Sequence, residues 1–153
     1  MISKIISGGQ TGADRAGLDF AIQHDIPHGG WIPKGRKTEA GPLPSHYQLK
    51  EMPWESYPKR TAKNVQDSDG TLIVTHGRLT GGSAFTRECA SKAKRPRLHI
   101  DLNISDFDEA ADQVKKWIEK HNIMTLNVAG PRGSKDPKIY QDTMTLLKMT
   151  ISR

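Results

Sequence analysis

The sequence has little cysteine, few aromatic residues and no long apolar run. Cys89 is the only cysteine among 153 residues, so the chain forms no internal disulfide and no cysteine-based zinc site. Its position in an expected helix favours a small core residue over a nucleophile. No apolar run approaches about 18 residues, so no membrane span is expected. Lys4 is followed too soon by glycines and Asp14 for a signal peptide, and we expect a cytoplasmic protein.

Acidic residues are fewer than basic residues. The chain holds 23 Lys and Arg against 17 Asp and Glu, which gives a formal net charge of +6. Much of the excess lies in Lys34–Lys37 and Lys92–Arg97. A nucleic-acid surface is compatible with this charge, but the three Trp, three Tyr and three Phe show no stacking-motif spacing. The composition therefore favours a small anionic ligand over a polynucleotide, and nucleic acid is the lesser alternative.

Metal-binding spacing is also absent from the sequence. The six histidines show neither an HxH nor an HExxH pattern. We therefore expect no metal ion held by protein side chains.

Short apolar segments alternate with segments of helical periodicity along the whole chain. The apolar segments predict strands at residues 2–6, 26–31, 70–75, 97–101 and 125–129, with a short edge strand at 48–52. The periodic segments predict helices at residues 13–24, 57–67, 83–94, 105–121 and 137–151. Residues 34–47, with several glycines and prolines, predict a long loop, for which a lid role is a hypothesis. This alternation predicts one α/β domain over residues 1–153, with a mainly parallel sheet between two helical layers.

The stretch Ile5–Asp14 is typical of a strand, a glycine turn and a helix start. Free N–H groups and the partial positive charge of a helix start attract anions, and glycines let a ligand approach the backbone. The stretch matches neither the Walker loop nor the dinucleotide fingerprint. An alternative is a self-capped helix, since Thr11 and Asp14 have capping-box spacing. The residues predicted to bind a phosphate here are Gly8, Gly9, Gln10, Thr11, Gly12 and Asp14.

A second glycine pair, Gly81 and Gly82, precedes another helix start. The backbone at this pair, with the hydroxyls of Ser83 and Thr86, is predicted to hold a phosphate or another oxyanion. Glu88 lies about two turns into the helix, where it could bond a ribose hydroxyl or a base, or act as an acid or base. The alternative for Glu88 is a surface salt bridge.

Polar candidates also lie on a third loop and on the helix expected at residues 57–67. Arg132, in the loop at residues 130–134, is a candidate to clamp an anion. Arg60 and Asn64 share a helical face, where Arg60 could bind a phosphate and Asn64 a ribose or a base. The alternative is an exposed basic face. The three glycine loops each follow a parallel strand, so we expect them to converge at one edge of the sheet.

Five segments carry motifs that are specific in combination. They are residues 5–15, 28–36, 64–69, 79–82 and 127–132, which read IISGGQTGADR, HGGWIPKGR, NVQDSD, LTGG and NVAGPR. Together they resemble the molybdenum carrier family over nearly the whole chain, which implies a Rossmann-like fold. That family is similar in turn to a group containing the molybdenum-cofactor carrier proteins, the lysine-decarboxylase-like proteins and the cytokinin-activating phosphoribohydrolases.

The phosphoribohydrolases carry a helical Arg and a Pro-Gly-Gly-x-Gly-Thr-x-x-Glu motif at the site where the glycosidic bond breaks. By this resemblance, Arg60 and Glu88 would hold catalytic roles. Thr80 stands where that motif has proline, and Ala84 and Phe85 stand where it has Gly-Thr.

Three functions follow as hypotheses. The first is a molybdenum-carrier-like protein that binds the molybdenum cofactor or a nucleotide derivative through two glycine loops. The second is a phosphoribohydrolase that cleaves the N-glycosidic bond of a nucleoside 5′-monophosphate. The third is a nucleic-acid-binding protein. Related folds often pair through helices, so we also expect a homodimer.

Overall fold

In the computed structural model, which describes residues 1–151, five parallel strands form the central sheet in the order β2-β1-β7-β5-β6. A second, two-stranded parallel sheet joins β3 and β4. The strands are β1 (Lys4–Ile6), β2 (His28–Gly29), β3 (Trp31–Ile32), β4 (Lys50–Glu51), β5 (Gly70–Thr75), β6 (Arg97–Asp101) and β7 (Thr125–Ala129).

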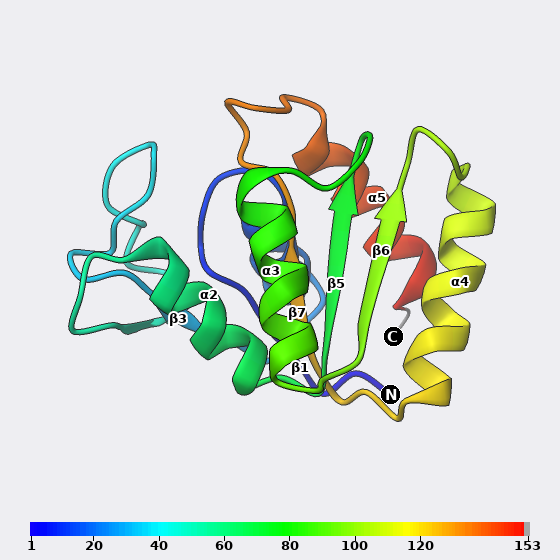
Figure 1. Cartoon of the computed structure of the whole chain (residues 1–153), viewed down its shortest axis with the longest axis horizontal. Coiled ribbons are helices and arrows are strands. Elements are labelled where there is room, and N and C mark those ends of the chain that lie inside the picture. The colour runs from blue at the N-terminus through cyan, green and yellow to red at the C-terminus, as the bar shows by residue number, and fades with distance from the viewer. Residues whose placement is uncertain (152–153) are drawn as a thin grey trace.

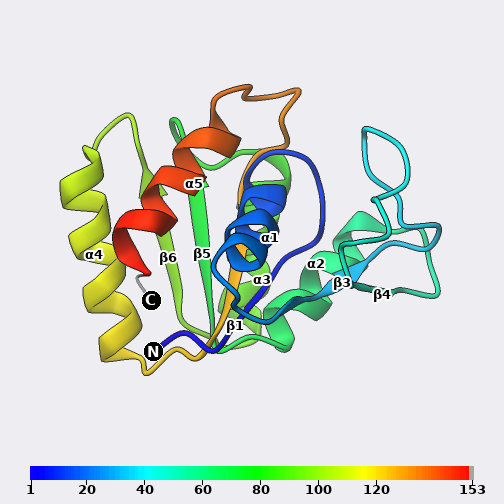
Figure 2. The same ribbon diagram turned by 180° about the vertical axis from the view of Figure 1, so that it is seen from behind.

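Helices cover both faces of the central sheet. Figures 1 and 2 show α1, α4 and α5 on one face, and α2 and α3 together on the other. The predicted three-layer, Rossmann-like α/β fold is therefore confirmed. No helix among residues 1–151 is long and apolar enough to cross a membrane. The helices are α1 (Ala13–Gln23), α2 (Tyr57–Gln66), α3 (Gly81–Lys92), α4 (Phe107–Lys120) and α5 (Ile139–Thr150).

The apolar pattern of the sequence explains the core. β5 is buried at every residue, because β6 and β7 flank it and helices cover both of its faces. Its apolar run Leu72, Ile73 and Val74 thus packs toward the two helical layers in turn. On α4 the helical period turns Val114 and Trp117 inward, into the cluster that α4 shares with α5. Each large buried side chain contributes about 1.5–3 kcal/mol, which holds these layers together.

Several element ends differ from the sequence predictions. α3 begins at Gly81, earlier than the expected residue 83, and α5 begins later than expected. The helix expected from residue 105 begins at Phe107, as α4. Asp106 is its N-cap residue, and the Asp106 side chain accepts a hydrogen bond from the Glu109 amide at 2.8 Å. The predicted strand at 26–31 divides into β2 and β3, which belong to different sheets.

The long connection between β3 and β4, called the β3–β4 loop, is held by its own hydrogen bonds. The Arg36 side chain donates to the carbonyls of Leu43, Pro44 and Tyr47 at 2.9, 2.8 and 2.6 Å. The Tyr47 hydroxyl donates to Asp19 on α1 at 2.5 Å. This loop is therefore a structured element fastened to α1.

The three glycine loops meet at one edge of the sheet. β1, β7 and β5 are neighbouring parallel strands, so the loops that follow them lie together at their carboxyl ends. Figure 1 shows this edge at the top, next to the start of α3. The topology thus brings together segments that are far apart in the sequence.

Candidate functional site

A cavity of about 640 Å³ lies at this edge, between α2, α3 and the three glycine loops. Most of the residues predicted to bind a ligand line it, and a few do not. Those that line it are Gly8, Gln10, Asp14, Arg60, Asn64, Gly81, Gly82, Ser83, Thr86 and Arg132. Those that the structure leaves outside its lining are Gly9, Thr11, Gly12 and Glu88. The cavity therefore combines residues of all the segments that the sequence singled out.

The first glycine loop is filled by the chain itself. A Cβ atom on Gly8 would lie 2.4 Å from Nη1 of Arg60, so the missing side chain makes room for that guanidinium. Gly12 has a φ of 82°, and a Cβ there would lie 2.3 Å from the Pro131 carbonyl oxygen. These two glycines therefore serve packing within the protein.

Thr11 and Asp14 do not form the capping box that their spacing allows at the start of α1. Gly12 is the N-cap residue, and no side chain caps the helix. The Ala13 amide donates to the Pro131 carbonyl at 3.2 Å instead. The Asp14 carboxylate accepts from the Gln10 amide at 3.3 Å.

The second glycine loop, in contrast, is open. Thr80 is the N-cap residue of α3, and it makes no side-chain capping bond. The amides of Ser83 and Ala84 bond to the Thr80 carbonyl, whereas those of Gly81 and Gly82 find no acceptor among residues 1–151. A Cβ on Gly82 would meet nothing within 4 Å. Free amides at a helix start attract an anion, and this start faces the cavity.

Basic side chains dominate the charged lining of the cavity. Arg60 comes from α2, and the loops contribute Arg78, Arg132 and Lys135. Lys135 lies close to the open helix start, since a Cβ on Gly81 would be 3.1 Å from its Nζ atom. An anionic group at the start of α3 would thus be held by free amides and by cations.

The acidic lining is smaller, and part of it is paired. Asp136 bonds to Nδ1 of His76 at 2.5 Å, and Asp142 bonds to Nε2 at 2.7 Å. Burial lowers the pKa of His76, but hydrogen bonds and charge from both carboxylates outweigh it and raise the pKa. When His76 is protonated, its charge offsets that of Asp136 on the cavity wall.

Asp14 is the other carboxylate that lines the cavity. Burial raises its pKa to about 6, against the charges of Arg60 and Arg15 and the hydrogen bond from the Gln10 amide. Arg60 is itself only 7% exposed, and its Nη1 donates to the Gly8 carbonyl. A carboxyl group with a pKa of about 6 inside a cavity is a candidate for binding or proton transfer.

The two asparagines of the cavity have different roles. Asn64 accepts a hydrogen bond from the Trp31 amide at 2.7 Å and donates to the Trp31 carbonyl at 3.0 Å, which fastens β3 to α2. Asn127 donates to Thr71 on β5 at 3.2 Å and lines the cavity from the central strand β7. Asn127 was expected only as part of the NVAGPR motif, although a polar residue within a buried strand was the available signal for a cavity residue.

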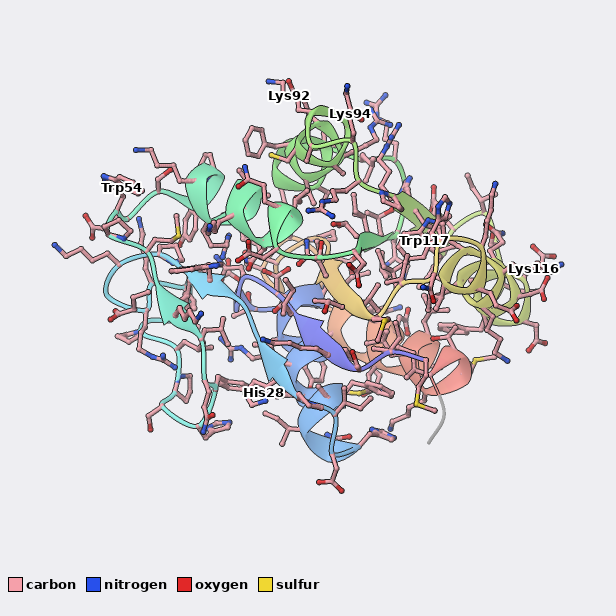
Figure 3. The ribbon with its side chains drawn as sticks, turned by 90° about the horizontal axis from the view of Figure 1, so that it is seen from below. His28, Trp54, Lys92, Lys94, Lys116 and Trp117 are labelled. Atoms are coloured by element: carbon pink, nitrogen blue, oxygen red, sulfur yellow. The ribbon has the colours of Figure 1, made fainter. Side chains whose placement is uncertain are left out.

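Glu88 lies outside the cavity, which corrects its predicted contact with a ligand. Its side chain is 58% exposed and pairs with Lys92 at 3.4 Å. Figure 3 shows Lys92 on the outer surface of α3. Ser83 and Thr86 face inward, and at about 100° per residue Glu88 then points to the opposite side of the helix. The structure thus shows the surface salt bridge that was the alternative.

The described part of the chain contains no cluster of side chains suited to coordinating a metal ion. No group of three or more His, Cys, Asp and Glu residues within 1–151 could hold a metal ion. Cys89 is free and buried, beside Val65 of α2 and Ala90 of α3.

Comparison with known proteins finds one close structural relative. It is the crystal structure, at 1.45 Å resolution, of a protein named "Putative molybdenum carrier protein" from Syntrophus aciditrophicus SB. The two chains are 59% identical, with a TM-score of 0.98, over 99% of this chain and 96% of that one. Among curated proteins, none matches significantly. The family described as "Circularly permutated YpsA SLOG family" matches residues 5–151. The resemblance to the molybdenum carrier family is thereby confirmed, and the chain belongs to the circularly permutated YpsA SLOG family.

Proposed function

We propose that the protein binds a phosphate-bearing, nucleotide-like ligand in the cavity, with the phosphate at the start of α3. The observation that carries this proposal is the open pair Gly81 and Gly82, whose amides have no acceptor within residues 1–151. Arg60 and Lys135 add positive charge to the same cavity. Its volume of about 640 Å³ is suited to a small molecule of nucleotide size.

The structural relative is named "Putative molybdenum carrier protein", and the family resemblance adds the molybdenum cofactor to this class of ligands. The molybdenum cofactor carries a phosphate, so the donors at Gly81, Gly82 and Lys135 suit it in the same way as a nucleotide. In this proposal the protein is a carrier, and the bound cofactor would supply the molybdenum. The rest of the cavity, with Tyr57 and Phe85 among its lining, would surround the ring system.

Calorimetric titration with AMP and with inorganic phosphate tests the proposal. Gly82→Glu places a negative charge at the open helix start, and we expect it to weaken binding at least about tenfold. Ser91→Glu is the matched control, because it adds the same charge at the exposed end of α3. If the parent bound neither probe at millimolar concentration, or if Gly82→Glu bound as tightly as Ser91→Glu, the proposal would be wrong.

Hydrolysis of an N-glycosidic bond is a second candidate, and the raised pKa of Asp14 favours it. Glu88 lies on the outer face of α3, so we assign the role of acid or base to Asp14, which lies beside Arg60. Arg60 would stabilise negative charge on the phosphate or the leaving group. Release of free base from AMP by the parent, and not by Asp14→Asn, is the expected result. Absence of release from any nucleoside monophosphate would leave binding as the function.

A further inference from the structure

Glu39, at the tip of the β3–β4 loop, is surrounded by hydrogen-bond donors from two of the glycine loops. Its Oε2 atom accepts from the Thr11 hydroxyl and, at 3.1 Å, from the Ser134 amide. Its Oε1 atom accepts from the Ser134 hydroxyl at 2.5 Å and lies 3.5 Å from Nε of Arg132. We call Thr11, Arg132 and Ser134 the anion cradle.

A contact within the protein orients the Thr11 hydroxyl of the anion cradle. The Gly133 amide donates to the Thr11 oxygen at 3.0 Å, so the Thr11 hydroxyl hydrogen is free to point at Glu39. Backbone amide, hydroxyl and guanidinium together form a donor set typical of a carboxylate or phosphate site. The hydrogen bonds from Ser134 and Thr11 accordingly lower the pKa of Glu39.

The anion cradle adjoins the cavity. Arg132 lines the cavity and belongs to the cradle. Gln10 also lines the cavity, and its side-chain oxygen accepts a hydrogen bond from the Glu39 amide at 3.0 Å. The two hydrogen bonds from Ser134 to Glu39 bring the tip of the β3–β4 loop next to the loop that follows β7. A ligand in the cavity could therefore reach the cradle through Arg132.

The β3–β4 loop keeps its shape through contacts that do not involve the Glu39 side chain. Arg36 holds three carbonyls of the loop, and Tyr47 bonds to Asp19 on α1. The side chain of Glu39 is 21% exposed, so it has a path to solvent. Withdrawal of this one carboxylate would thus leave the loop folded and the donors accessible.

We propose that Thr11, Arg132 and Ser134 form a second anion-binding site at the edge of the cavity, which holds the chain's own Glu39 carboxylate and accepts an external carboxylate or phosphate in its place. Glu39 then competes with the external anion for the donors of the anion cradle. A ligand with two anionic groups would place one at the start of α3 and displace Glu39 with the other. The site uses donors that differ from those of the proposed phosphate site, so each can be tested without the other.

Anion titrations of Glu39→Ala, followed by the NMR signals of backbone amides, test this site. Formate and inorganic phosphate are the probes, at an ionic strength kept constant with chloride. In Glu39→Ala we expect the Ser134 amide signal to shift saturably, with a midpoint at least about tenfold lower than in the parent. Glu51→Ala is the matched control, because Glu51 contacts the Gly35 amide of the same loop and not the cradle.

The second variant, Glu39→Ala with Ser134→Ala, removes one cradle hydroxyl and should weaken the response of the backbone amide at position 134. Glu39→Gln keeps the side-chain size and serves if Glu39→Ala is poorly folded, with the same direction expected and a smaller change. An equal response of the parent and both Glu39 variants, or no response in any of them, would overturn the second site. Signals of Gly81 and Gly82 in the same spectra report the proposed phosphate site separately.

Discussion

Asp14 and Arg60 interact electrostatically as a buried pair at the cavity, with exposed fractions of 8% and 7%. Burial raises the pKa of Asp14 to about 6, although the charge of Arg60 opposes the shift. Burial also lowers the pKa of Arg60, and the charge of Asp14 opposes that shift in turn. Each charge therefore reduces the cost of burying the other, without removing it.

Asp14→Asn tests this pair through the pH dependence of stability. The pKa of Asp14 is raised from 3.8 to about 6 by burial in the folded protein, so between these values the folded state binds more protons than the unfolded state. The parent should lose stability relative to Asp14→Asn as pH rises from about 4 to about 6, by on the order of 2–3 kcal/mol. Urea unfolding of both proteins across this range measures the change. A difference that is independent of pH would contradict it.

His76 should titrate above its ordinary pKa of 6.5, because Asp136 and Asp142 bond to its two ring nitrogens. The stability that it contributes is then fully present below about pH 6.5 and is lost as pH rises through the folded pKa. NMR titration of the imidazole signals measures this value, and Asp142→Asn should lower it. His99 gives an internal reference, since burial lowers its pKa. The prediction fails if the pKa of His76 lies at or below 6.5, or below that of His99.

Gly12→Ala and Gly82→Ala should have opposite effects on stability. At Gly12 a Cβ would collide with the Pro131 carbonyl oxygen, and the positive φ adds strain, so we expect a loss of more than about 1 kcal/mol. At Gly82 the space is open and the position is helical, so alanine should be neutral or stabilise by up to about 1 kcal/mol. Thermal and urea unfolding compare the two variants. Equal losses would show that the second glycine loop is also packed.

Asn64→Ala should destabilise the protein far more than Lys63→Ala, its neighbour on α2. Asn64 is 2% exposed, and its removal leaves the partly buried backbone N–H and C=O groups of Trp31 without these partners, at a cost of about 2–4 kcal/mol. Lys63 makes an exposed ion pair with Asp67, which contributes less than about 1 kcal/mol. Urea unfolding of both variants measures the loss in free energy of unfolding that each causes. Similar losses would mean that the Asn64 bonds add little.

The bounds of β5, β6 and β7 are those that the sequence predicted. These strands are short runs with apolar and β-branched residues, ended by turn residues, and they pair in the sheet along their whole length. Local preference and tertiary burial therefore agree. The start of α3 differs from the predicted residue 83. Gly81 has a φ of 50°, outside the usual helical range, and is still the first residue of the helix.

The location of the candidate site could be predicted from the sequence, but several of its side-chain contacts could not. Topology alone brings Gly8, Gly81 and Arg132 to one cavity. The orientation of Glu88 depends on the rotation of α3 against the sheet, which a linear motif does not contain. No local pattern marks Glu39, because its hydrogen-bond partners Thr11 and Ser134 are 28 and 95 residues away along the chain.

The sequence by itself determined the order of strands and helices and the edge where the three glycine loops meet. Both follow from local periodicity and from the rule that loops after parallel strands share one edge. Only the tertiary structure decided that Arg60 and Pro131 fill the first glycine loop while the second stays open. It also decided that Asp14, and not Glu88, presents a carboxylate to the cavity. Contacts between segments distant in sequence set these outcomes, and no local pattern records them.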